Sequence, residues 1–165
     1  MTPIEQAIIM WIHLISASIW VGGSLFIGIV FSPLLKSMFD SVEERLQIMI
    51  KVGKRFNKIA VPSLIILMGT GLYNSHQLLS KPDLLTATSY GNFLIIKIIL
   101  VIALVITYVI HVRIIRKDVE EKIMSKQMSN HQIQKLRKKI IILGEITVVL
   151  SVAILFFAAL LDAGV

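Results

Sequence analysis

The sequence predicts an all-α integral membrane protein: a four-helix antiparallel transmembrane bundle with both termini outside. Hydrophobic residues make up 56% of the 165 positions, which is more than a soluble domain usually contains. They are concentrated in four long stretches separated by polar segments. The first stretch, residues 8–31, contains no Asp, Glu, Lys or Arg. As a helix it would be roughly 36 Å long, enough to cross a hydrocarbon core of about 30 Å.

Length and composition limit the kinds of site that the chain can build. Its 165 residues are expected to form one membrane domain, 1–165, without room for a separate catalytic module. The absence of cysteine excludes disulfides and thiolate metal sites. Glu5 and the three further spans argue against a cleaved signal peptide. The net charge of +7 comes from the loops, so it indicates membrane topology rather than nucleic-acid binding.

The elements follow from the residues that separate the apolar stretches. Ser32-Pro33 is expected to break the first helix near the membrane edge. The amphipathic segment after it begins with a capping box at Ser41 and Glu44. We expect a helix there that either lies at the interface or continues into the second span. The four spans are predicted at residues 8–31, 59–79, 92–112 and 140–161.

The connections between the spans differ strongly in charge. Of the 17 Lys and Arg residues, six lie in residues 32–58 and nine in residues 113–139, whereas the 80–91 loop carries one. Because cytoplasmic loops are enriched in Lys and Arg, both basic loops are predicted to be cytoplasmic and both termini extracytoplasmic. The composition of residues 113–139 also predicts helical extensions of the spans, around a polar break near Ser129-Asn130.

Three polar side chains from three spans are predicted to share one layer near the outer face. His13 lies roughly 8 Å below the boundary, His76 roughly 5 Å and Lys97 roughly 7 Å, counted at about 1.5 Å per residue. Because ionisable residues inside a membrane are costly and usually face the bundle interior, this layer is the candidate site. His13 and His76 are the candidate metal ligands. Alternatively, His13 is a hydrogen-bonded core residue, His76 lies among headgroups, and Lys97 extends to the interface.

A second polar layer, formed by His111 and Glu145, is predicted near the cytoplasmic face. It lies about 20 Å from the outer layer, so His13 and His111 cannot bind the same metal ion. Glu145 is expected to form an ion pair with a basic residue of the cytoplasmic loops.

Two imidazoles on different helices can hold a redox metal in two ways. They can be axial ligands of a haem b, or they can form a copper site together with Met or water. The haem alternative places a porphyrin-wide apolar gap near Gly69 and Gly71, with Lys97 or Arg55 near a propionate. The residues alone slightly favour haem, because Met clusters are lacking. The copper alternative predicts a path along one face of the first span, lined by His13, Ser16, Trp20 and Ser24.

Several short motifs occur in a characteristic order: His13 with Trp20-Val-Gly-Gly23, Arg55-Phe56 before Gly69-Thr-Gly-Leu-Tyr73, Tyr90-Gly91 before Lys97, and Arg137 to Glu145. In these motifs the chain resembles the CopD family, the membrane domain linked to copper resistance and uptake. The resemblance covers most of the chain, from about Trp11 to Leu161. It implies copper binding or transport at the outer face, a partner that carries copper outside the membrane, and the plasma membrane of a prokaryote.

The same positions are similar to HemJ, the membrane protoporphyrinogen oxidase that binds haem b. HemJ likewise has a first-span His with Trp seven residues later, an Arg before the second span and a Lys in the third. This chain has those residues at His13, Trp20, Arg55 and Lys97. It departs from HemJ after Trp20, where Val-Gly-Gly replaces an aromatic and Pro-Arg continuation. The similarity implies a haem b redox protein as the alternative to a copper protein.

A third class of function is a non-catalytic subunit of a membrane complex, in which the histidines are structural. No residue supplies a recognisable catalytic base, so the catalytic residues and any enzymatic activity are left open. Small-residue faces such as Gly69-Thr-Gly71 are compatible with a homo-oligomer as well as with packing inside one chain. The predicted function is therefore redox-metal handling. Copper is preferred to haem b because of the resemblance to the CopD family.

Overall fold

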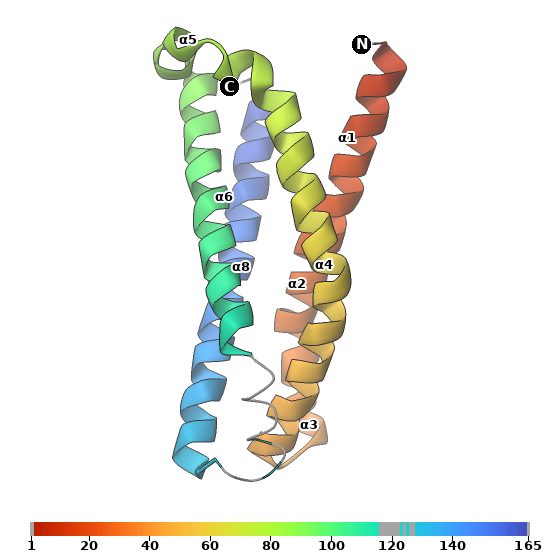
Figure 1. Cartoon of the computed structure of the whole chain (residues 1–165), viewed down its shortest axis with the longest axis vertical. Coiled ribbons are helices and arrows are strands. Elements are labelled where there is room, and N and C mark those ends of the chain that lie inside the picture. The colour runs from red at the N-terminus through yellow and green to blue at the C-terminus, as the bar shows by residue number, and fades with distance from the viewer. Residues whose placement is uncertain (1, 116–122, 124, 126–127, 165) are drawn as a thin grey trace.

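The computed structural model describes residues 2–115, 123, 125 and 128–164. Four of its helices are long and apolar enough to cross a membrane. They alternate in direction, so both termini lie at the same end of the bundle (Figure 1). Within the described residues there is no strand. The predicted all-α, four-helix membrane fold is therefore confirmed.

The first membrane helix is longer than predicted and runs from Pro3 to Met38. Thr2 opens it with a capping box, in which its hydroxyl accepts from the Glu5 amide at 3.3 Å and its own amide donates to the Glu5 carboxylate at 3.0 Å. Two π-helical turns interrupt the α-helical hydrogen bonding. The segments are α1 (Pro3–Ala17), η1 (Ser18–Gly22), α2 (Gly23–Leu25), η2 (Phe26–Phe31) and α3 (Ser32–Met38).

The predicted break at Ser32-Pro33 is wrong, because helical backbone continues to Met38. Pro33 lies in the first turn of α3, directly after the π-helical turn η2. Proline lacks an N–H and its ring crowds the carbonyl four residues earlier. In the wider π-helical turn the Ser32 N–H bonds the carbonyl of Ile27, five residues back, and this change of partners accommodates the proline.

The second membrane helix, α4 (Val42–Leu79), is one continuous element of 38 residues. Ser41 caps its start, with the hydroxyl accepting from the Glu44 amide at 3.4 Å. Of the two alternatives for the amphipathic segment, continuation into the second span is therefore confirmed. Pro62 lies inside α4 without ending it.

The remaining elements agree with the predicted order of spans. The predicted 80–91 loop contains a short helix, α5 (Pro82–Ala87), before α6 (Ser89–Ile114). The fourth span, α8 (Asn130–Asp162), begins at the predicted break, where Ser129 and Gln132 form a capping box. The predicted extension of the third span beyond residue 115 lies outside the described residues.

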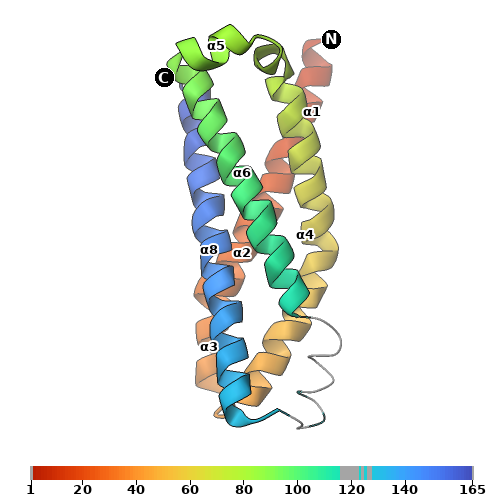
Figure 2. The same cartoon turned by 60° about the vertical axis from the view of Figure 1, so that its left-hand side comes forward.

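The helices pack as two pairs, α1 with α4 and α6 with α8. Figure 2 shows α6 running obliquely, from beside α8 near the termini toward α4 at the other end of the bundle. The first helix, α4 and α6 share one buried apolar cluster: Trp20, Val21, Ala60, Leu64 and Leu104. A second buried apolar cluster lies nearer the end of the bundle opposite the termini. It contains Leu46, Ile50, Ile123, Ile133 and Ile140.

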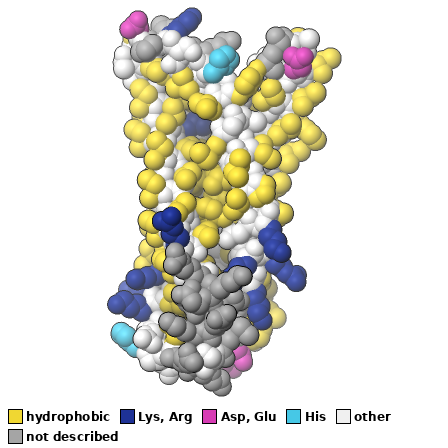
Figure 3. Space-filling view, viewed as in Figure 1, with side chains coloured by type: hydrophobic (Ala, Val, Ile, Leu, Met, Phe, Trp, Pro, Cys, Tyr) yellow, Lys and Arg dark blue, Asp and Glu magenta, His cyan; other side chains and the backbone are white. Residues whose placement is uncertain are grey.

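Charged and apolar side chains occupy different levels of the surface. Figure 3 shows an apolar band around the middle of the bundle and Lys and Arg side chains concentrated at the end opposite the termini. Many large apolar residues in this band are exposed, among them Phe26, Ile65, Ile99 and Phe156. Such a surface is suited to lipid, because no hydrophobic penalty accompanies its exposure there. The orientation of the two ends in a membrane stays a prediction.

Candidate functional site

His13 faces the neighbouring helix. It is half-buried between α1 and α4, and its Nδ1 lies 2.6 Å from Thr70 Oγ1. A Cβ atom added to Gly71 would lie 3.7 Å from His13 Cε1, so the imidazole packs directly over the α4 backbone. The small residues of α4 therefore make room for this ring.

The hydrogen bonds of Thr70 determine which nitrogen of His13 carries the proton. The Thr70 hydroxyl already donates its hydrogen to its own helix, to Ile66 O at 2.7 Å and more weakly to Leu67 O at 3.4 Å. With its hydrogen donated to Ile66 O, the hydroxyl accepts from His13, and Nδ1 is then the protonated nitrogen. The Nε2 atom of the neutral ring is left with a lone pair. Histidines that bind metals are commonly held in this way, with the other ring N–H donated to a second group.

The two other members of the predicted outer layer are arranged differently. The His76 ring turns back onto its own helix, where Nδ1 lies 2.7 Å from Tyr73 O and the ring stacks on the Tyr73 ring at 5.6 Å between centroids. His76 is exposed, and the structure does not bring it against His13. Lys97 of α6 is partly buried.

The described residues offer no closed metal cage. Among them, no three His, Asp or Glu side chains gather where they could hold one metal ion. The thioethers of Met10 and Met68 belong to side chains that are 43% and 46% exposed. Among the described residues the outer layer therefore contains no complete coordination shell.

Trp20 lies at the centre of the bundle and connects its helices. It is 3% exposed, and its Nε1 donates to Ser151 Oγ on α8 at 3.0 Å. Its ring meets the Tyr108 ring of α6 edge-on, with 4.9 Å between centroids and 73° between planes. The Tyr108 hydroxyl donates to Asn57 Oδ1 of α4 at 3.0 Å. One chain of polar and aromatic contacts therefore joins all four membrane helices.

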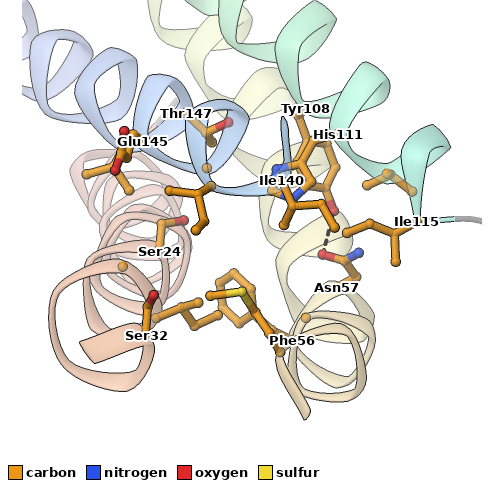
Figure 4. A pocket seen from close by; sticks show the side chains of 18 of the residues that line it. Ser24, Ser32, Phe56, Asn57, Tyr108, His111, Ile115, Ile140, Glu145 and Thr147 are labelled. Atoms are coloured by element: carbon orange, nitrogen blue, oxygen red, sulfur yellow. Dashed lines mark hydrogen bonds between the residues drawn. The ribbon is translucent and has the colours of Figure 1, made fainter. Parts of the chain in front are cut away.

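A cavity of about 560 Å³ lies between Trp20 and the basic end of the bundle. Figure 4 shows side chains of all four membrane helices around it, with the Tyr108–Asn57 hydrogen bond at its wall. His111 and Glu145, the predicted second layer, both line this cavity. His111 Cε1 would lie 3.7 Å from a Cβ atom at Gly144, so a glycine again makes room for an imidazole. The structure thus brings the second layer together around a cavity.

The other predicted cofactor-binding residues lie apart from this cavity. Arg55 and Gly69 are exposed, and a Cβ atom added to Gly69 would meet no atom within 4 Å. The haem alternative predicts its gap near Gly69 and Gly71, but neither glycine lines this cavity, which surrounds His111. Glu145 is exposed at the cavity's edge, and its predicted ion pair stays a prediction.

Several residues of these sites were not identified from the sequence. The most important are Thr70, which orients His13, and the cavity residues Tyr108, Asn57 and Gly53. Thr70 had a recognisable signal, since it is the polar residue within the small-residue run of the second span. Asn57 lies in the charged approach to that span, where its contact with the third helix leaves no pattern in the sequence.

Comparisons with known proteins agree with this geometry of a small membrane bundle. The CopD family, described as copper resistance protein D, matches residues 50–161. An uncharacterised protein of Aquifex aeolicus (strain VF5) is 36% identical over 72 residues, which are 43% of this chain and 48% of the relative. The match thus spans about half the length of that relative. No solved structure matches the chain. Because the family match covers more than half of its residues, the protein is a member of the CopD family.

Proposed function

We propose that this CopD-family protein binds copper at His13 and moves it through the bundle from the outer face. The observation that carries the proposal is the hydrogen bond between His13 Nδ1 and Thr70 Oγ1 at 2.6 Å. With Nδ1 donating in this bond, Nε2 carries the lone pair that would bind the metal. Imidazole nitrogen is a suitable ligand for copper. The family's description as copper resistance protein D supports copper as the metal.

The ligand set fits an ion in passage better than a resident ion. A single imidazole binds copper weakly enough to release it, whereas a closed set of three or four protein ligands would retain it. The described part of the chain has no such closed set. Copper is therefore the cargo in this proposal rather than a permanent cofactor.

Buried hydroxyl groups support a route through the bundle. The polar side chains that are fully buried among the described residues are all small alcohols: Ser16, Ser63, Thr147 and Ser151. Ser16 follows His13 by one turn on the first helix, while Thr147 lines the cavity on α8. Their oxygens provide polar contacts between the His13 level and the His111 level. Polar residues inside a membrane commonly mark ion pathways.

The direction of passage follows from the charge distribution. The positive-inside rule places the basic end of the bundle in the cytoplasm, so the end with the termini and α5 faces outward. In this proposal a copper-carrying protein outside the membrane delivers the ion to that end, close to His13. The membrane is the plasma membrane of a prokaryotic cell.

Copper binding by the purified protein tests the assignment of His13. Wild type, His13→Ala and His131→Ala are loaded with Cu(I) in detergent under reducing conditions, desalted, and analysed for copper by mass spectrometry. His131 is the matched control, because it is exposed at the start of α8 and far from the proposed ligand. Wild type and His131→Ala are expected to retain copper, and His13→Ala to lose it while eluting at the same volume.

Three results would overturn this assignment. Equal copper content in wild type and His13→Ala would remove His13 as the ligand. A Soret band with sharp α and β bands after dithionite reduction would instead identify a haem b protein. If neither copper nor haem is present in the wild-type protein, the histidines are structural, as expected for a non-catalytic subunit.

A further inference from the structure

The cavity around His111 has the size and lining of a small-molecule site. Its volume of about 560 Å³ falls within the range of pockets that bind cofactors and other small ligands, roughly 300–1,000 Å³. Most of its wall is aliphatic or aromatic. This volume is larger than a metal ion needs and the wall is mostly apolar, so the cavity is suited to an organic molecule.

His111 is the polar group whose partner is missing. Its ring lines the cavity, and Figure 4 shows it beside Tyr108. No hydrogen bond joins this imidazole to another described residue, and the side chain is partly buried at the cavity wall. An unpaired polar group in such a place costs free energy unless a bound molecule or water pairs with it. The imidazole N–H can therefore donate to an acceptor inside the cavity.

Aromatic residues and a second donor surround the same space. Trp20, Phe56 and Tyr108 all line the cavity, and aromatic side chains of this kind stack on flat rings. Asn57 uses its carbonyl oxygen to accept from Tyr108, which leaves its amide NH₂ as a further donor. A Cβ atom at Gly53 would meet nothing within 4 Å, so the cavity is open beside this glycine.

The cavity can be reached from the lipid-facing surface. Ile29 of η2 and Val149 of α8 both line it, yet their side chains are 66% and 67% exposed. In a membrane these exposed side chains contact acyl chains. A ligand would therefore enter laterally between η2 and α8, which requires that it be soluble in lipid.

We propose that this cavity binds a lipid-soluble quinone. Its ring lies among Trp20, Phe56 and Tyr108, a carbonyl oxygen accepts from His111, and the isoprenoid tail leaves between η2 and α8. An acyl chain has no acceptor for His111 and gains nothing from the aromatic residues. The proposal concerns a different site from His13, and it stands whether or not copper binds there.

Quenching of Trp20 fluorescence by decylubiquinone tests the proposal. The protein has two tryptophans, and Trp11 is 62% exposed and lies outside the cavity. Trp11→Phe therefore leaves Trp20, at the cavity wall, as the reporter. In this background, reconstituted in detergent–lipid micelles, decylubiquinone is expected to quench Trp20 saturably. Decanol has a similar chain but no quinone ring, and it is expected not to displace decylubiquinone.

Two glycine variants separate the cavity from general membrane partitioning. Gly53→Leu fills the open space, whereas Gly69→Leu adds the same side chain to the same helix at an open position outside the cavity. Gly53→Leu is expected to weaken decylubiquinone binding at least about tenfold and Gly69→Leu to leave it unchanged. His111→Leu, which keeps the volume and removes the donor, is expected to weaken it about tenfold, equivalent to one hydrogen bond of about 1.4 kcal/mol.

Three outcomes would overturn the proposal. Quenching that does not saturate, or that is equal in Gly53→Leu and Gly69→Leu, would show partitioning into lipid only. Displacement by decanol would make the cavity a site for an acyl chain. A Soret band that His111→Leu removes would make it a haem site. Equal elution profiles and thermal melting of the glycine variants confirm that Gly53→Leu has folded.

Discussion

At the scale of single residues, the state of His13 depends on Thr70 as much as on the histidine itself. The hydrogen bond between Thr70 Oγ1 and His13 Nδ1 orients the ring, and the direction of this bond sets the tautomer. The same imidazole without this partner could expose either nitrogen. The coordinating ability proposed for His13 therefore depends on a residue that does not touch the metal.

Replacing Thr70 tests this dependence. Thr70→Val keeps the shape of the side chain and removes the hydroxyl, so copper affinity is expected to fall about 10- to 100-fold, as when an outer-shell partner is lost. Thr70→Ser retains the hydroxyl and is the matched control. Competition with a Cu(I) chelator measures both affinities. Equal affinities of Thr70→Val and wild type would show that the hydrogen bond does not prepare the ligand.

A second residue-scale prediction concerns the buried bond between Trp20 and Ser151. Hydrogen bonds between membrane helices contribute about 0.6 kcal/mol on average and up to about 1.7 kcal/mol. Ser151→Ala is expected to lower the free energy of unfolding by an amount in this range, because the Trp20 N–H stays buried without its acceptor. Unfolding in SDS measures the change. In a Trp20→Phe background, Ser151→Ala should have a smaller effect, and strictly additive losses would contradict a direct coupling.

At the scale of elements, Gly22 and Gly23 are adjacent in the first membrane helix but have different surroundings. A Cβ atom at Gly23 would overlap the Phe56 ring of α4, whereas one at Gly22 would meet nothing within 4 Å. Gly23 therefore permits the Phe56 ring of α4 to lie against the α2 backbone, and both Trp20 and Phe56 line the same cavity. The two π-helical turns on either side of α2 belong to the same stretch.

The two glycines give a matched pair of variants. Gly23→Leu must displace Phe56 and is expected to destabilise the protein by about 1–3 kcal/mol, the usual cost of overpacking. Gly22→Leu adds the same side chain next to it and is expected to change stability much less. SDS unfolding measures both. A greater loss in Gly22→Leu than in Gly23→Leu would contradict the packing described here.

The sequence predicted the existence and order of the membrane helices better than their ends. Apolar length identifies a span, but it does not show where a polar, amphipathic continuation stops. Apolar length places the second span at residues 59–79, whereas the capping signal at Ser41 predicts the start of the longer helix, which begins at Val42. Pro33 was expected to end a helix because the rule for proline assumes α-helical bonding, which η2 replaces locally.

At the scale of the whole molecule, the candidate sites show what a sequence pattern can and cannot reveal. His13 stands out because an imidazole deep in an apolar stretch is rare. Matching residues by depth did not reveal how the side chains are turned: His13 faces Thr70 of α4, whereas His76 turns back onto Tyr73 of its own helix. Depth gives the level of a side chain and not its rotation about the helix axis. The cavity depends on four helices meeting, so no single segment encodes it.

The orientation of the bundle is also a property of the whole molecule, and it can be tested cleanly. The chain contains no cysteine, so a single introduced thiol reports on its own position. Thr86→Cys, exposed on α5, is expected to react with a membrane-impermeant maleimide in intact cells. Gln134→Cys, exposed near the start of α8, should react only after permeabilisation. The reverse pattern would place the termini in the cytoplasm and invert the proposed direction of copper movement.

The central claim is that His13 carries copper into the membrane, and flux measures it most directly. Proteoliposomes loaded with a fluorescent Cu(I) indicator would contain wild type, His13→Ala or His131→Ala, with equal protein content and orientation. Wild type and His131→Ala are expected to move Cu(I) into the lumen at the same rate, and His13→Ala to fall to the rate of protein-free vesicles. Copper flux through His13→Ala at the wild-type rate would contradict the account.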